Sequence, residues 1–232
     1  MYSRSKGRVI DTSITVDPVA RYIPLGLRLL LYLVLTWFLV DCIPLFYSYD
    51  PNMQWPLPIW ILRTFTFLPL HEGGHFISIP FGKTFYILGG SFWQIVFPIL
   101  WFAIALKQKS QVAPFPLFWA GENMMDVSLY IRDAEKMALP LLGGHKSGHD
   151  WHNLLTQWDL LDSAESIADV VFYSGLLISI VAIIGGIAWA LVSCYQSGIP
   201  QKPVPVVRDM REERLEISLR ERIQKKDGKD LL

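Results

Sequence analysis

Long apolar stretches dominate the chain, and they restrict the folds that are open to it. Polar or proline-containing connections separate five hydrophobic blocks: Pro24–Phe46, Trp55–Phe81, Phe85–Leu106, Pro114–Ile131 and Ile167–Val192. A helix of about 20 residues crosses the hydrocarbon core of a bilayer. The fourth block is short and polar, so it would stop at the interface or be shielded by its neighbours. The pattern predicts an all-α, polytopic transmembrane helical bundle of about four to six spans.

Composition agrees with a membrane protein and suggests three regions. Hydrophobic residues make up 52% of the chain and charged residues 18%, whereas soluble domains are about 25% charged. We expect a polar N-terminal segment at 1–22, a transmembrane domain at 23–193 and a charged helical tail at 194–232. The formal net charge of zero gives no nucleic-acid footprint. The predicted location is a membrane, with the bacterial cytoplasmic (inner) membrane as our expectation.

The second apolar block contains the sequence His-Glu-Gly-Gly-His at residues 71–75. Histidines at i and i+4 share a helix face, so His71 and His75 can reach one metal ion. Glu72 between them is placed to accept a proton from a water at the metal. Ionisable groups in an apolar span are costly, which favours a metal site. The alternatives are a pair of packed histidines beside Arg63, or a structural metal.

A third ligand must come from elsewhere, because a catalytic zinc site takes three protein ligands and leaves one position for water. In the fourth block Glu122 and Asp126 are i and i+4 neighbours, so they share a helix face, and Asn123 lies beside them. Two carboxylates on one buried face favour a bound cation. The alternative for them is an ion pair with Arg63 or Arg132.

The connection at 132–166 offers further candidates in the run His149-Asp150-Trp151-His152. A histidine beside a carboxylate could bind the metal, or could steady a tetrahedral oxyanion. We rank His149 second to Asp126 as a metal ligand and assign His152 a catalytic role. Apolar positions at i, i+3, i+4 and i+7 predict a short amphipathic helix on the membrane surface above the site; these positions are Trp151, Leu154, Leu155 and Trp158.

The run from His71 to His75, followed by Gly82 and then Gly89-Gly90, resembles the first half of the site-two protease family, which consists of intramembrane zinc metalloproteases. The resemblance covers roughly residues 60–130. It implies that His71 and His75 bind zinc and that Glu72 activates water.

By the same resemblance, Asp126 completes the site as an aspartate on a later span. The second motif departs from the family pattern, which has a proline after the asparagine and a glycine after the aspartate. Here Met124 follows Asn123, and Val127 follows Asp126. The identity of the third ligand is therefore the weakest part of the resemblance.

These observations predict an integral-membrane zinc metallopeptidase with one Zn²⁺ per chain. Glu72 would be the general base, and Asn123 or His149 would steady the oxyanion. The expected partners are membrane lipid, a membrane-embedded or juxtamembrane polypeptide substrate, and other membrane proteins. The alternative function is a non-proteolytic subunit of a membrane complex with a structural metal, or a hydrolase of a lipid-like substrate.

Overall fold

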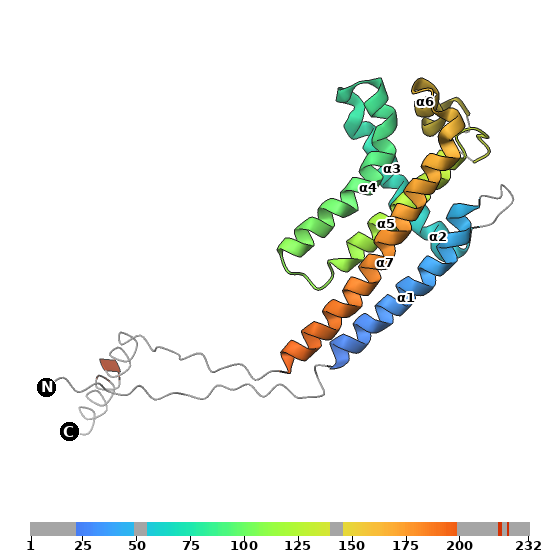
Figure 1. The fold of residues 1–232 in the computed structure, drawn as a ribbon. Helices are drawn as coiled ribbons and strands as arrows, with labels where there is room; N and C mark the ends of the chain where they lie inside the picture. Colours follow the sequence, from blue (N-terminus) through green and yellow to red (C-terminus); the bar gives the residue numbers. More distant parts are fainter. Residues whose placement is uncertain (1–21, 49–54, 140–145, 199–217, 220–221, 223–232) are drawn as a thin grey trace, which may run out of the picture.

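The computed structural model describes residues 22–48, 55–139, 146–198, 218–219 and 222. Across these residues all regular secondary structure is helical (Figure 1), which confirms the predicted all-α class. The predicted N-terminal segment and most of the predicted charged tail lie outside the described residues.

The helices follow the predicted hydrophobic blocks closely. Their bounds are α1 (Tyr22–Tyr47), α2 (Leu57–Leu62), α3 (Leu68–Ser78), α4 (Lys83–Lys107), α5 (Pro114–Arg132), α6 (Asp150–Gln157) and α7 (Ala164–Ser197). A π-helical turn at Arg63–Phe67 joins α2 to α3, and a 3-10 turn at Ile79–Phe81 follows α3. The second block therefore forms α2, α3 and these two turns, and each other block forms one helix.

In the part of the chain that the structure describes, three helices are long and apolar enough to cross a membrane. They are α1, α4 and the segment Leu161–Ser197, which is α7 with the turn before it. Large apolar side chains remain exposed on all three, including Leu33 (66%), Ile104 (55%) and Ile184 (63%). Such a surface belongs in lipid, as expected for a membrane protein.

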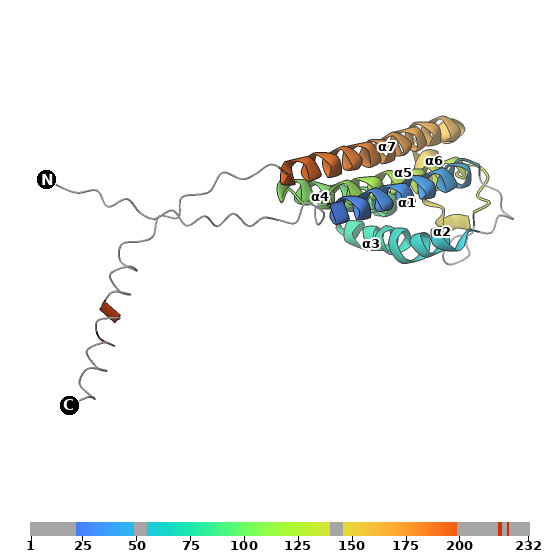
Figure 2. The ribbon, with the colours of Figure 1, turned by 90° about the horizontal axis from the view of Figure 1, so that it is seen from below.

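Helix α5 is the centre of the bundle. Thirteen of its nineteen residues are buried, and α1, α4 and α7 all pack against it. Figure 2 shows α3 and α7 on opposite sides of this central group. The polar residues of the fourth block are therefore shielded by neighbouring helices, as the sequence allowed.

Small residues bring the helices close together at two crossings. A Cβ on Gly175 of α7 would lie 2.6 Å from the carbonyl oxygen of Gly121 on α5. A Cβ on Gly74 of α3 would collide with the carbonyl oxygen of Gly89 on α4. Small residues at helix crossings are typical of membrane proteins, because they let the two backbones approach. The second crossing presses the histidine motif against the first half of α4.

Candidate metal centre

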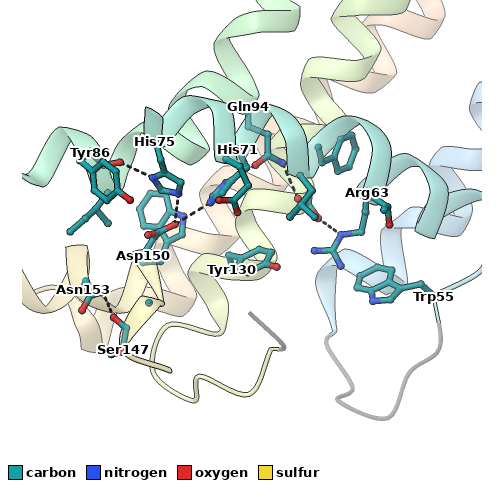
Figure 3. Close-up of a pocket in the computed structure, with 18 of the residues that line it drawn as sticks. Trp55, Arg63, His71, His75, Tyr86, Gln94, Tyr130, Ser147, Asp150 and Asn153 are labelled. Atoms are coloured by element: carbon teal, nitrogen blue, oxygen red, sulfur yellow. Dashed lines mark hydrogen bonds and ion pairs between the residues drawn. The ribbon is translucent and has the colours of Figure 1, made fainter. Parts of the chain in front are cut away.

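His71 and His75 lie one turn apart on α3, and their rings meet a carboxylate from the distant helix α6. The Nε2 atoms of His71 and His75 are 3.0 Å and 3.1 Å from the same Oδ2 atom of Asp150, the first residue of α6 (Figure 3). The donor atoms of this His71–His75–Asp150 cluster all lie within 4.8 Å of one another. The structure thus brings together two predicted ligands and one carboxylate that the sequence did not assign as a ligand.

The other ring nitrogen of each histidine faces an acceptor. His75 Nδ1 is 2.7 Å from the carbonyl oxygen of Tyr86. His71 Nδ1 is 3.1 Å from Oε1 of Gln94. Because these oxygens only accept, both Nδ1 atoms carry the proton in the neutral rings. Both Nε2 atoms therefore present lone pairs to Asp150.

Three electron-pair donors at such short distances require a cation between them. In a metal-free chain, protons on the Nε2 atoms of the imidazoles can provide this positive charge. In a metal-bound chain, the metal ion provides it. Zinc lies about 2.0–2.2 Å from histidine nitrogen and carboxylate oxygen, which places tetrahedral donors about 3.3 Å apart. The two nitrogen–oxygen separations of 3.0 Å and 3.1 Å require only a small widening, and the remaining pair of donor atoms lies within 4.8 Å. The residues therefore fit a zinc ion.

The charge state of Asp150 suits a ligand. Burial acts to raise the pKa of Asp150, but in the metal-free chain hydrogen bonds from His71 and His75 with protonated Nε2 atoms outweigh it and hold this pKa below its usual value. Asp150 is therefore anionic at neutral pH. An anionic carboxylate offsets part of the double charge of a divalent ion, which an amide cannot do.

A cavity of about 720 Å³ opens beside the cluster, a size typical of ligand sites. Glu72 lines this cavity together with His71, His75 and Asp150. Glu72 is exposed and stays outside the group of three donors. The predicted general base thus lies beside the cluster without taking part in it.

Asp126, the predicted third ligand, has other partners. Arg63 Nε lies 2.7 Å from its Oδ1, and Gln94 Nε2 donates to its Oδ2 at 2.8 Å. Asp126 is 4% exposed and is not part of the three-donor cluster. The ion pair with Arg63, the alternative that the sequence left open, accounts for Asp126. Glu122 lies deeper in the bundle, against Cys42, and it does not line the cavity.

His149, the second-ranked candidate ligand, lies outside the three-donor cluster, and both of its ring nitrogens have other partners. Its Nδ1 accepts from the backbone N–H of His152 at 3.1 Å, which caps the start of α6. Its Nε2 lies 3.2 Å from Oδ2 of Asp133. The neighbouring residue, Asp150, is the first residue of α6, and its side chain contacts His71 and His75 of α3.

The two other predicted catalytic residues stay away from the cavity wall. Asn123 is buried in α5 and donates its amide to the carbonyl oxygen of Trp119 at 2.7 Å. His152 donates from Nδ1 to the carbonyl oxygen of Ala134 at 2.8 Å. Asn123 thus belongs to the bundle interior, and His152 fastens α6 to the end of α5.

The predicted amphipathic helix is present as α6, and several contacts hold it in place. Leu154 and Leu155 are buried, and Trp151 Nε1 donates to Ser91 Oγ of α4 at 3.0 Å. Asp133 accepts from the backbone N–H groups of Ala138 and Leu139 as well as contacting His149. Burial acts to raise the pKa of Asp133, but these hydrogen bonds hold it below its usual value. The docked helix positions Asp150.

Sequence reasoning did not single out Asp150 as a candidate ligand or Gln94 as a partner of His71. One signal for Gln94 was available. Gly90 and Gln94 are i and i+4 on α4, so they share a face, and a Cβ on Gly90 would lie 2.6 Å from Nε2 of both histidines. Gly90 leaves room for the two rings, and Gln94 follows one turn later.

Comparisons with family models, with curated proteins and with solved structures found no match to this chain. The function of the site is therefore argued from its own geometry.

Proposed function

We propose that the chain is an integral-membrane zinc metallopeptidase that hydrolyses a peptide bond in or near the membrane. One observation carries the proposal: Nε2 of His71, Nε2 of His75 and Oδ2 of Asp150 converge while both Nδ1 atoms are committed elsewhere. A zinc ion bound there supplies Lewis-acid polarisation and lowers the pKa of a water molecule to about 7.

Glu72 is the residue that we assign as general base. It lies next to His71 in sequence and lines the same cavity. Its carboxylate accepts the proton of the attacking water and later returns it to the leaving amine. Asp150 stays an anionic ligand, so the two carboxylates have separate tasks.

The cavity walls suit a polypeptide. Aromatic and aliphatic groups such as Trp55, Phe67 and Ile87 line it together with Lys83 and Asn153. An extended peptide needs apolar surface for its side chains and polar groups for its backbone. We propose a membrane-embedded or juxtamembrane segment as the substrate.

The sequence resemblance to site-two proteases supports peptide hydrolysis, but our proposed ligand set differs from the one it implies. Asp150 on a connecting helix takes the place expected for Asp126. We further propose that the second block and α5 complete a bundle of four to six spans with α1, α4 and α7. The bacterial cytoplasmic membrane is our proposed location.

The test combines metal analysis with hydrolysis by detergent-purified protein. We expect about one zinc per chain, lost in His71→Ala. Glu72→Gln should keep the zinc and lower hydrolysis of quenched-fluorescent transmembrane peptides by about 10²–10⁴-fold. Glu165→Gln, which alters an exposed glutamate in the first turn of α7, is the matched control.

Equal zinc in the wild type and His71→Ala would refute the metal site. Zinc that depends on His71, combined with hydrolysis that does not depend on Glu72, would refute the assigned base. Zinc that depends on His71 in a wild-type protein that hydrolyses no peptide would instead favour the structural metal of a non-proteolytic membrane-complex subunit.

A further inference from the structure

We propose that Gln94, oriented by Asp126 and Arg63, is a positioning residue that fixes the tautomer of His71 and thereby sets the zinc affinity of the site. This inference rests on the metal centre of the proposed function. It gives a role to three polar side chains that are not among the three proposed donors.

The three residues form a continuous chain of contacts that ends at His71. Arg63 Nε lies 2.7 Å from Asp126 Oδ1. Gln94 Nε2 lies 2.8 Å from Asp126 Oδ2. Gln94 Oε1 lies 3.1 Å from His71 Nδ1. Figure 3 shows the links running from Arg63 toward His71.

The charge and the hydrogen bonds along this chain favour one orientation of the Gln94 amide. Arg63 forms an ion pair with one oxygen of the Asp126 carboxylate. The other oxygen of Asp126 accepts from the amide nitrogen of Gln94, which turns Oε1 of Gln94 toward His71. That oxygen can only accept, so Nδ1 of His71 holds the proton. The lone pair of the neutral ring is therefore on Nε2, where the metal binds.

Burial makes this order strict. Gln94 is 2% exposed and Asp126 is 4% exposed, so water competes little for their hydrogen bonds. Buried polar networks are costly when a member loses its partner. A flipped Gln94 amide would put its nitrogen against a donor and its oxygen against a carboxylate. The network thus resists the tautomer that would place a proton on Nε2.

Arg63 is itself held firmly at the outer end of the network. Its guanidinium carbon lies 4.1 Å from the ring centroid of Trp55. Arg63 is the first residue of the π-helical turn, and its carbonyl accepts from the N–H of Leu68. Such turns are rare and often occur at functional sites. The charge of Arg63 also neutralises Asp126, so this carboxylate does not compete with Asp150 for the cation.

The two histidines differ in a way that a mutation can exploit. His75 Nδ1 is fixed by the backbone carbonyl of Tyr86, which no side-chain replacement removes. His71 Nδ1 is fixed by a side chain. Replacing Gln94 therefore loosens one ligand and leaves the other unchanged.

The experiment measures zinc affinity by competition with a chelator in the full-length, detergent-purified protein. Gln94→Met keeps the length of the side chain but removes the acceptor. We expect it to lower zinc affinity by about 10–100-fold, the usual effect of losing a partner of a metal ligand. Gln157→Met is the control, because Gln157 is exposed and its amide donates to Thr84 Oγ1, away from the proposed donors.

A double replacement separates positioning from general damage. In Gln94→Glu with Asp126→Asn, the new carboxylate accepts from His71, and the new amide donates to it while accepting from Arg63. We expect zinc affinity within about threefold of the wild type, against a loss of about tenfold or more for Asp126→Asn alone. This rescue would not occur if Asp126 were a zinc ligand.

Wild-type affinity in Gln94→Met would overturn the inference. If Gln94→Met fails to fold, the double variant decides: restored affinity supports the inference, and lost affinity in a folded double variant overturns it. Failure of the metal centre has a different signature, since the wild type would then hold no zinc that depends on His71.

Discussion

Gly90→Ala tests directly whether the two histidines point where the structure places them. A Cβ at Gly90 would lie 2.6 Å from Nε2 of both His71 and His75. Non-bonded heavy atoms are best separated by about 3.5 Å or more, so each ring must retreat by about 0.9 Å. The rings cannot retreat freely, because their Nδ1 atoms are hydrogen-bonded to Gln94 and Tyr86.

The expected effect on zinc is much larger than the effect on folding. Alanine favours a helix over glycine by about 1 kcal/mol, and overpacking costs about 1–3 kcal/mol. The helix preference offsets part of the overpacking cost, which leaves a destabilisation of about 0–2 kcal/mol. Displacing two ligand atoms should cost more than losing one outer partner, which is worth about 10–100-fold. We therefore expect a loss of at least about 100-fold in zinc affinity, or about 2.7 kcal/mol.

Chelator competition on the purified protein measures the affinity, and thermal unfolding in detergent reports the fold. Gly73→Ala is the matched control, since Gly73 lies in the same motif and an added Cβ meets nothing within 4 Å. It should bind zinc like the wild type. Wild-type zinc affinity in Gly90→Ala would show that the rings lie elsewhere and would refute the geometry of the site.

Three other changes probe the third ligand, the anchor of α6 and its packing. Asp150→Asn should lower zinc affinity more than Asp126→Asn, because it removes the anionic donor; an equal loss, measured by the same competition, would contradict the assignment. The lowered pKa of Asp133 means that its stabilising effect is complete above the unfolded value of about 3.8 and is lost as the pH falls through the lower native value. The protection of the α6 amides from hydrogen exchange, relative to the intrinsic rate at each pH, should therefore fall in acid. Asp133→Asn should show the lower protection already at neutral pH; identical protection in both proteins would exclude Asp133 as an anchor. Leu154→Ala empties a fully buried position and should destabilise the docked helix by about 2–5 kcal/mol, seen as faster proteolysis around α6, whereas unchanged cleavage would indicate that α6 is held by polar contacts alone.

Much of the fold could be predicted because the hydrocarbon core of a bilayer accepts few kinds of sequence. Each membrane-spanning helix needs a long apolar run, so the blocks at Pro24–Phe46 and Phe85–Leu106 correspond to α1 (Tyr22–Tyr47) and α4 (Lys83–Lys107). The amphipathic spacing after Asp150 likewise predicted α6, because one face of a short helix must pack against the protein or the membrane. These patterns are local, and local periodicity is visible in a sequence.

The carboxylate that contacts His71 and His75 could not be predicted, because it depends on which charges distant in sequence come together. Asp126 and Asp150 are both carboxylates beside promising neighbours, and nothing local separates them. In the structure Arg63 pairs with Asp126, and this contact depends on how α5 packs beside the π-helical turn. The role of His149 as the N-cap of α6 was hidden for a related reason, because the sequence does not show at which residue that helix begins.

The separation of the donors along the chain has a consequence for how such a site comes into being. Asp150 lies 79 residues after His71, beyond α5. A fragment that stops between the end of α5 and Asp150 contains the whole His-Glu-Gly-Gly-His motif and every helix from α1 to α5, yet it offers only the two imidazoles of the proposed ligand set. Metal capture during biosynthesis would therefore wait until α6 has emerged and docked. On the proposed ligand set, a nascent chain without α6 would have no metal-dependent activity. A truncated product would contain an intact His-Glu-Gly-Gly-His motif but no complete metal centre.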